Sequence, residues 1–271
     1  MLNRYPTERQ IQRFNLVVFY RTANGGNWFH NDNWLSYDVS ECQWFSSAPS
    51  EEPICDEDDN FITLNLTSNN LSGTFTLTNT FIPSLVIFDV SNNDLDGRVP
   101  TAVSSPNLEV LAVSDNRFEG QLVGDGVFAA FKLRVIKIDG NQIVGSSASY
   151  VYRFLPHLEI LNVTSNLFHG EFNGELRHCP NMTYIGFGHN DICGSIPTEM
   201  GVLTHLQELD VSGNPRMQGN IPEELSTLNY LTKLDVSGTR IAGGVPEPIC
   251  ERIEDNLMTL IANCSFVECC M

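Results

Sequence analysis

The chain has 271 residues, of which 33 are acidic and 15 basic, and its formal net charge at pH 7 is −18. This charge argues against nucleic acid and anionic membrane surfaces as partners, because phosphate groups are bound by basic patches. It favours a soluble protein with basic or neutral partners. No apolar run approaches the ~20 residues of a membrane helix, and the polar start MLNRYPTERQ does not form a secretory signal.

The first segment predicts a helix that begins near Thr7, where TERQ matches a capping box. Ile11, Phe14 and Val18 fall on one side of this helix, as in an amphipathic helix. Asn24-Gly25-Gly26 then ends it, because these residues tolerate positive φ angles.

Aromatic and acidic residues follow the predicted helix. Trp28, Trp34 and Trp44 suit a cover over the apolar end of a first structural repeat better than a sugar-binding platform. A run of carboxylates comes next, at Glu51, Glu52, Asp56, Glu57, Asp58 and Asp59. Calcium is the alternative there, but no glycine-centred loop with alternating ligands is present, so we interpret the run as a solvated loop. We expect no metal and no cofactor.

Residues 61–249 contain eight copies of one pattern, which begin FITLNLTSNNLSG at Phe61 and end LTKLDVSGTRIAGGVP at Pro246. Its punctuating residues are Asn69, Asn93, Asn116, Asn141, Asn166, Asn190, Asn214 and Thr239. From 69 to 239 the chain takes seven steps, so the period is about 24 residues, within the range of leucine-rich repeats.

The pattern has a physical reason. In Leu-x-x-Leu-x-Leu the last apolar positions alternate with polar ones, as a short strand with one buried face requires. The following Asn turns the chain, because its side-chain amide can bond backbone groups that no strand neighbour serves. Stacked copies then form a ladder of amides, in which the Thr239 hydroxyl can do part of the work.

The motifs NDICGSIP, NPRMQGNIP and NNDLDGRVP resemble the signature of the plant-type leucine-rich-repeat family. LVVFYRTANGGNWFHNDNWLS resembles the family's N-terminal cap, and ICERIEDNLMTLIANCSFVECC resembles the cysteine-rich end of receptor-like repeat proteins from unicellular algae. The resemblance implies an α/β solenoid, a right-handed superhelix with a concave parallel β-sheet. We expect a helical N-terminal cap over 1–60, eight repeats over 61–249 and a cysteine-rich C-terminal cap over 250–271.

The outward residues of the strands predict a binding surface on the concave face. The central column reads Asn65, Asp89, Ala112, Lys137, Asn162, Gly186, Asp210 and Asp235. We expect turns and short helical pieces, such as PTEMGVL and PEELSTL, on the convex side. The candidate ligand-binding residues are Tyr184, His189, Glu208, Asp210, Lys233, Asp235, Asp89, Arg134 and Lys137.

Most cysteines lie towards the two ends, which indicates disulfides that close an extracellular solenoid. We predict a Cys42–Cys55 bond, and bonds from Cys250 and Cys264 to Cys269 and Cys270. The alternatives are a strained Cys269–Cys270 bond or a zinc site, whose paired Cys-x2-Cys knuckles are missing. Cys179 and Cys193 flank one strand, so we expect two unpaired thiols, the first packed inside and the second near the surface.

Five Asn-x-Ser/Thr sequons are present, at Asn65, Asn70, Asn162, Asn181 and Asn263. Those at Asn65, Asn162 and Asn181 are the better glycosylation candidates. The sequence contains none of the GxSxG, HExxH or phosphate-cradling motifs, so we expect no enzyme.

The sequence therefore predicts a monomeric recognition module at the cell surface or outside the cell, with a protein, peptide or glycan ligand. Receptor-like signalling is what the resemblance implies, and any membrane attachment would use a segment outside this chain. The alternatives are a secreted inhibitor of a glycan-degrading enzyme and a structural surface or matrix protein.

Overall fold

The structure is a computed structural model that describes residues 7–47, 52–75, 82–99, 105–121, 132–147, 150–254 and 258–263. The chain forms two compact units: unit 1 contains residues 1–133 and 140–143, and unit 2 contains residues 134–139 and 144–271.

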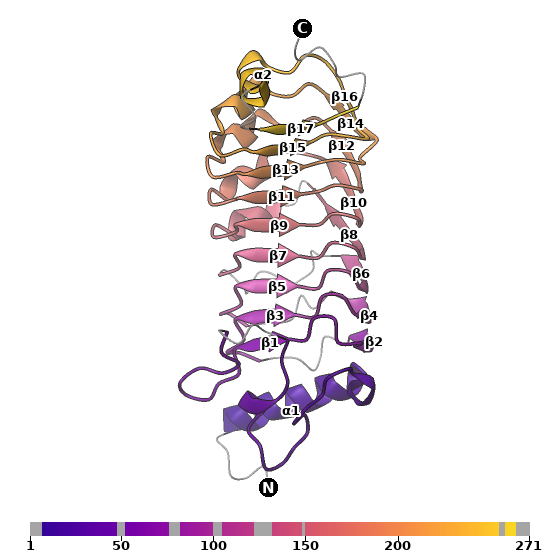
Figure 1. Ribbon diagram of the computed structural model, residues 1–271, viewed down its shortest axis with the longest axis vertical. Coiled ribbons are helices and arrows are strands. Elements are labelled where there is room, and N and C mark those ends of the chain that lie inside the picture. The colour runs from indigo at the N-terminus through magenta and orange to yellow at the C-terminus, as the bar shows by residue number, and fades with distance from the viewer. Residues whose placement is uncertain are drawn as a thin grey trace. The chain divides into compact units, whose positions relative to one another are not determined.

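Unit 1 combines a helical cap with short parallel strands in two sheets (Figure 1). The cap contains α1 (Thr7–Thr22) and the 3-10 helices η2 (Gly25–Asn27) and η3 (Glu41–Gln43). One sheet pairs β1 (Thr63–Asn65), β3 (Ile87–Asp89) and β5 (Val110–Ala112). The other pairs β2 (Ser72–Phe75), β4 (Asp94–Arg98) and β6 (Arg117–Gln121).

Unit 2 has the same two-sheet arrangement. Its first sheet pairs β7 (Val135–Lys137), β9 (Ile160–Asn162), β11 (Tyr184–Gly186), β13 (Glu208–Asp210), β15 (Lys233–Asp235) and β17 (Thr259–Ile261). Its second pairs residues 144–146 of β8 (Gln142–Ser146) with β10 (Leu167–Glu171), which is followed by β12 (Asp191–Gly194), β14 (Arg216–Gly219) and β16 (Arg240–Ile241). In each unit we call the first sheet the odd-strand sheet and the second the even-strand sheet.

The odd strands follow the alternation that the repeat dictates. Their central residues, among them Phe88, Leu161 and Leu209, are buried, whereas most flanking residues face outward and are partly exposed. The predicted register of the outward column is confirmed within each unit, because Asn65 is opposite Asp89, and Gly186 is opposite both Asn162 and Asp210.

The connections between the sheets hold the helical pieces that the sequence predicts. These are the 3-10 helices η6 (Tyr150–Phe154), η7 (Gly174–His178), η8 (Thr198–Val202) and η9 (Glu223–Thr227). Pro197 and Pro222 directly precede η8 and η9. The even-strand sheet was not predicted, since only turns and helical pieces were expected beyond the bends.

The bends carry the asparagine ladder, and each Asn joins its own repeat to the preceding one. Asn190 donates from Nδ2 to the carbonyl of Phe187, at 3.0 Å, and to that of Val163 one repeat earlier, also at 3.0 Å. Its Oδ1 accepts the amide of Phe168 at 2.8 Å. Asn214 repeats this arrangement with Phe187 and Ile192. The buried amides therefore satisfy backbone groups that no strand neighbour serves.

Thr239 takes over part of this role, as predicted. Its hydroxyl donates to the Val236 carbonyl at 2.6 Å and accepts the Ile241 amide at 3.2 Å, both within its own repeat. The hydroxyl is too short to reach the preceding repeat. An Asn at position 239 would accept the Met217 amide of the preceding repeat. With Thr239 in place, the Met217 amide donates to the Asn214 carbonyl at 3.0 Å.

The structure corrects the prediction of which side of α1 is buried. Ile11 and Phe14 are 46% and 59% exposed, and the buried side carries Gln12, Arg13 and Leu16 instead. The helix turns this side inward because the cap holds a fully buried carboxylate, Glu41, and a buried charge must be paired.

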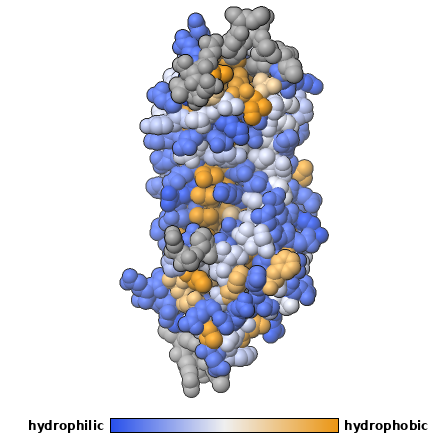
Figure 2. Space-filling model, viewed as in Figure 1, coloured by the Kyte–Doolittle hydropathy of each residue, from blue (hydrophilic) through white to orange (hydrophobic). Residues whose placement is uncertain are grey.

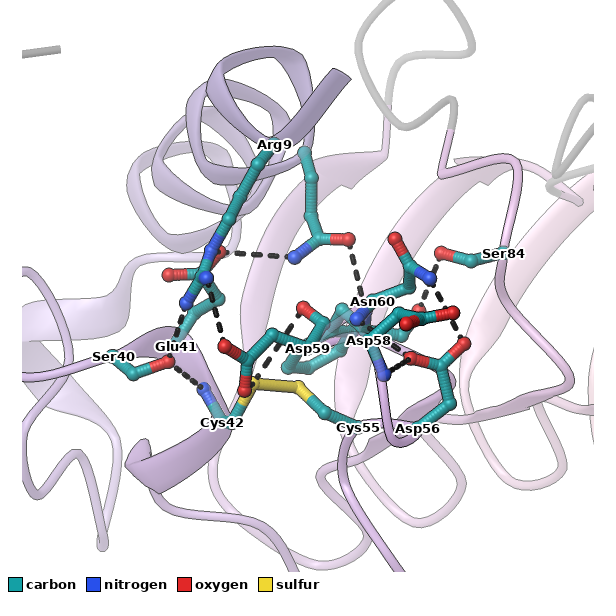
Figure 3. Close-up of a disulfide and its surroundings, with 12 residues drawn as sticks. Arg9, Ser40, Glu41, Cys42, Cys55, Asp56, Asp58, Asp59, Asn60 and Ser84 are labelled. Carbon is teal, nitrogen blue, oxygen red and sulfur yellow. Dashed lines mark hydrogen bonds and ion pairs between the residues drawn. A yellow bond between two sulfur atoms is a disulfide. The ribbon is translucent and has the colours of Figure 1, made fainter. Parts of the chain in front are cut away.

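The Glu41 network joins α1 to the loop of the disulfide (Figure 3). Glu41 accepts from Arg13 at 2.9 Å, from Gln12 at 2.9 Å and from Arg9 at 3.3 Å. Arg9 also reaches Asp59 at 3.0 Å. The predicted Cys42–Cys55 bond is present. It joins the residue that follows Glu41 to the start of the loop that carries Asp59.

The three tryptophans are buried, as a cover over the first repeat requires and a sugar platform does not. Trp34 packs against Trp28 and Trp44 with ring centroids 4.9 and 4.8 Å apart. The cap also supplies His30, whose amide and carbonyl bind the side chain of Asn69 at 2.7 and 2.8 Å. In this way the cap replaces the missing repeat before the first one.

The far end of unit 2 contains two elements that were not predicted. β17 extends the odd-strand sheet within 250–271, where only a cysteine-rich cap was expected. Helix α2 (Glu247–Glu254) precedes it, and Arg252 donates to the backbone carbonyls of Leu228, Asn229 and Leu231. In the described parts of the chain, no helix combines the length and hydropathy that a membrane-crossing segment needs.

Candidate ligand-binding face

The odd-strand sheet of unit 2 carries most of the predicted site residues on its outward face. Tyr184 and Glu208 are directly opposite on β11 and β13, as are Glu208 and Lys233 on β13 and β15. Asp210 and Asp235 are opposite each other one outward position further along. Neighbouring strands lie ~4.8 Å apart, so these five side chains form one continuous surface.

Two glycines shape the surface beside Tyr184. A Cβ at Gly186 would lie 2.8 Å from Cε1 of Tyr184, and a Cβ at Gly188 would lie 2.7 Å from Oδ2 of Asp210. The tyrosine ring and the Asp210 carboxylate therefore occupy space that a side chain at position 186 or 188 would fill. Partial burial, together with the carboxylates of Asp210, Glu208 and Asp139, raises the pKa of Tyr184, so the phenol stays protonated at neutral pH.

Two of the basic residues on this face are already paired. Arg134 contacts both carboxylate oxygens of Glu159, at 2.8 and 3.0 Å. Lys233 lies 3.6 Å from Glu208. Both pairs are partly exposed and therefore stabilise the fold weakly.

Asp210 and Asp235 differ from these pairs. Each uses Oδ1 to hold its own turn: Asp210 accepts the Ser212 amide at 2.9 Å, and Asp235 accepts the Ser237 amide at 3.0 Å. Within the part of the chain that the structure describes, neither carboxylate has an ion-pair partner. Like charges directly opposite on neighbouring strands repel, so this pair is a place where a cation would be stabilised.

The remaining predicted residues lie apart from this group. Lys137 is exposed on β7, and Asp89 belongs to β3 of unit 1. His189 is exposed at the bend with φ of 54°. The residue before the ladder position has φ between 50° and 68° in all eight repeats, so the His189 side chain belongs to the turn rather than to the strand face.

Two apolar residues of this face were not predicted from the sequence. Val135 and Ile160 are directly opposite on β7 and β9, Ile160 is opposite Tyr184, and all three are partly exposed. Figure 2 shows hydrophobic side chains gathered among hydrophilic ones on the face that carries the odd strands. A sequence signal could have identified them, namely the residue type two positions before the central column. That position is aliphatic in these two repeats and charged or polar in the last repeats.

The sequon residues occupy different environments. Asn65 and Asn162 lie in the outward column, where their Oδ1 atoms accept the amides of Thr67 and Thr164 at 3.2 Å. Asn181 is exposed on a connection and donates to the Pro156 carbonyl at 3.4 Å. A glycan on Asn162 would therefore stand on the candidate face, and one on Asn181 would not.

The thiols lie as predicted. Cys179 is buried and unpaired, and burial raises its pKa to about 12, whereas Cys193 is partly exposed and unpaired. Cys264, Cys269 and Cys270 lie outside the described residues, so the predicted bonds of Cys250 stay predictions. Across the described ranges, no three His, Cys, Asp or Glu side chains gather in a way that could hold a metal ion.

Comparison with known proteins finds similarity to leucine-rich-repeat proteins. The Leucine Rich Repeat family model matches residues 205–228. Receptor-like protein 41 of Arabidopsis thaliana is 30% identical over 133 residues, which are 49% of this chain and 15% of that protein. The chain thus matches only a small part of that relative's length.

Two solved structures share the fold. The LRR ectodomain of the Arabidopsis thaliana receptor kinase GASSHO1/SCHENGEN3, in complex with CASPARIAN STRIP INTEGRITY FACTOR 2, is 30% identical with a TM-score of 0.65. The match covers 73% of this chain and 23% of that one. The Arabidopsis receptor kinase HAESA, in complex with the peptide hormone IDA and the co-receptor SERK1, is 27% identical with a TM-score of 0.65 over 75% of this chain and 34% of that one. In its repeats and its two-sheet units the chain is therefore similar to plant-type leucine-rich-repeat proteins, among them plant receptor-like proteins and the ectodomain of a plant receptor kinase.

Proposed function

We propose that the chain is a non-catalytic recognition module that binds a peptide or protein on the outward face of the odd-strand sheet of unit 2. The observation that carries this proposal is the combination of Tyr184, partly exposed aliphatic side chains and two uncompensated carboxylates on one face. Binding hot spots favour aromatic anchors surrounded by polar groups. The complexes of the GASSHO1/SCHENGEN3 and HAESA ectodomains support a peptide or protein ligand and an extracellular location.

The proposal assigns no catalytic role to the carboxylates on this face. Asp210 and Asp235 each use one oxygen for a turn hydrogen bond, which suits fixed charges in a binding surface. The relatives are receptor proteins, and this also favours recognition over chemistry.

The test is selection from a display library of random 12-residue peptides against the full chain, produced without N-linked glycans and with the Cys42–Cys55 bond intact. The double variant Tyr184→Ala/Asp210→Lys serves for counter-selection. We expect enriched peptides that bind the wild-type chain and not the double variant. Enrichment of no such peptide, with both proteins equally folded by circular dichroism, would overturn the proposal.

A further inference from the structure

The surface between β7 and β15 combines an apolar and an acidic part. Val135, Ile160 and Tyr184 follow one another across three neighbouring strands in register. The same row continues with the paired Glu208 and Lys233. Asp210 and Asp235 lie two residues further along these strands, level with Gly186, over which the Tyr184 ring leans. An apolar row that leads into a pair of carboxylates fits a ligand with the same order of properties, an apolar side chain followed by a cation.

The arrangement of charges on this surface makes its acidic part selective for cations. Arg134 and Lys233 are held by Glu159 and Glu208, so they do not neutralise Asp210 and Asp235. The whole chain carries a net charge of −18, which steers cationic partners towards it. A guanidinium or ammonium group placed between the two carboxylates would relieve their mutual repulsion and lie near the Tyr184 ring.

The sheet also sets the spacing of such a ligand. From Ile160 on β9, the point midway between Asp210 and Asp235 lies two and a half strand spacings across the sheet and two residues along the strands, or about 14 Å in all. An extended chain advances about 3.3 Å per residue. Because a Lys or Arg side chain itself reaches several ångströms, a peptide that crosses the strands covers this distance in three or four residues.

We infer that this face binds an extended cationic peptide, in which an apolar side chain contacts Val135 and Ile160 and a Lys or Arg three or four residues away lies between Asp210 and Asp235. The inference rests on the proposed function and adds the chemical class and spacing of the ligand.

The first readout is the sequences of the selected peptides. We expect Lys or Arg enriched three or four positions from an aliphatic residue. Selected peptides without this enrichment would overturn the inference and leave the proposed function intact. Selection of no peptide would instead remove the proposed function, and the inference with it.

The second readout is a double-mutant cycle with one selected peptide. The protein change is Asp210→Asn/Asp235→Asn, which keeps the oxygen that accepts the turn amide and removes both charges. The peptide change is Arg to citrulline, which keeps the shape of the side chain and removes its charge. We expect citrulline to weaken binding about tenfold with the wild-type chain and less than about twofold with the double variant.

The matched control is Glu223→Gln/Glu224→Gln on η9, which removes the same charge from residues outside the odd-strand sheet. We expect it to leave affinity within about twofold, because exposed charges outside the contact surface are screened by salt. An equal citrulline effect in the wild-type chain and the Asn double variant would overturn the inference. Loss of binding on addition of EDTA would also overturn it, since a metal ion would then bridge the carboxylates.

Discussion

The buried bends and the outward face of unit 2 differ in how far their polar side chains are paired. At the bends, Asn190 makes hydrogen bonds with two repeats and leaves little unsatisfied. On the face, Asp210 and Asp235 bond only their own turns and have no ion-pair partner among the described residues. The bends therefore contribute mainly to stability, and the function that we propose assigns recognition to the face. Changes at one should leave the other nearly unaffected.

The largest expected effect is on binding. Tyr184→Ala combined with Asp210→Lys should weaken a selected peptide at least about 100-fold, or about 2.7 kcal/mol, because it removes the aromatic anchor and reverses a charge. Isothermal titration calorimetry measures this change. Lys137→Glu should alter affinity little, because Lys137 lies three strands away from Asp210, at the apolar end of the contact that we infer. The reverse ranking of the two variants would move the centre of the site from β11 and β13 to β7.

The second effect is on stability. Asn141→Ala should lower the free energy of unfolding by about 1–3 kcal/mol, since the Phe118 amide and the Val113 carbonyl would lose their buried partner. Urea denaturation measures it. Asn92 is exposed with φ of 56°, so Asn92→Gly is a better control than Asn92→Ala, which would add strain at positive φ. Equal midpoints for Asn141→Ala and Asn92→Gly would contradict the ladder's role.

The third effect concerns the sequon on the face. A glycan on Asn162 should weaken the selected peptide at least about tenfold, or about 1.4 kcal/mol, because it stands beside Ile160 and Gly186 on the binding surface. Affinity is measured before and after enzymatic deglycosylation, with Asn162→Gln as the glycan-free reference. A glycan on Asn181 should change affinity less than about twofold. Full-strength binding by chains glycosylated at Asn162 would exclude this face.

The smallest effect is a gain at the end of the ladder. Thr239→Asn should raise the free energy of unfolding by about 0.5–1.5 kcal/mol, because an amide could reach the preceding repeat where the hydroxyl stays within its own. Peptide affinity should not change. A loss of stability would mean that the Met217 amide, now bonded to Asn214, cannot rearrange.

Much of this architecture could be predicted from the sequence because the repeat sets it directly. The spacing of the apolar positions places Asn162, Gly186 and Asp210 in register, and the recurrent Asn identifies the bends. The Cys42–Cys55 pair could also be found, because both residues flank one loop of the cap.

Other features depend on partners that periodicity does not reveal. Residues around α1 offer two possible inner sides, and the buried Glu41 selects the one that carries Arg13. Each strand of the even-strand sheet of unit 1 buries a single residue, such as Leu95 on β4 or Phe118 on β6, so no alternation is visible. The apolar part of the proposed binding face was not predicted, because Val135 and Ile160 look like ordinary strand residues until their outward positions are known.

The most direct test of the central claim is hydrogen exchange of the full chain with and without a selected peptide. The account predicts slower exchange in segments 183–188, 207–212 and 232–237, which contain β11, β13 and β15. Segments 215–220 and 223–228, which contain β14 and η9, should exchange at the same rate in both samples. Protection confined to β14 or η9, with no change in the odd strands, would contradict the assignment of recognition to this face.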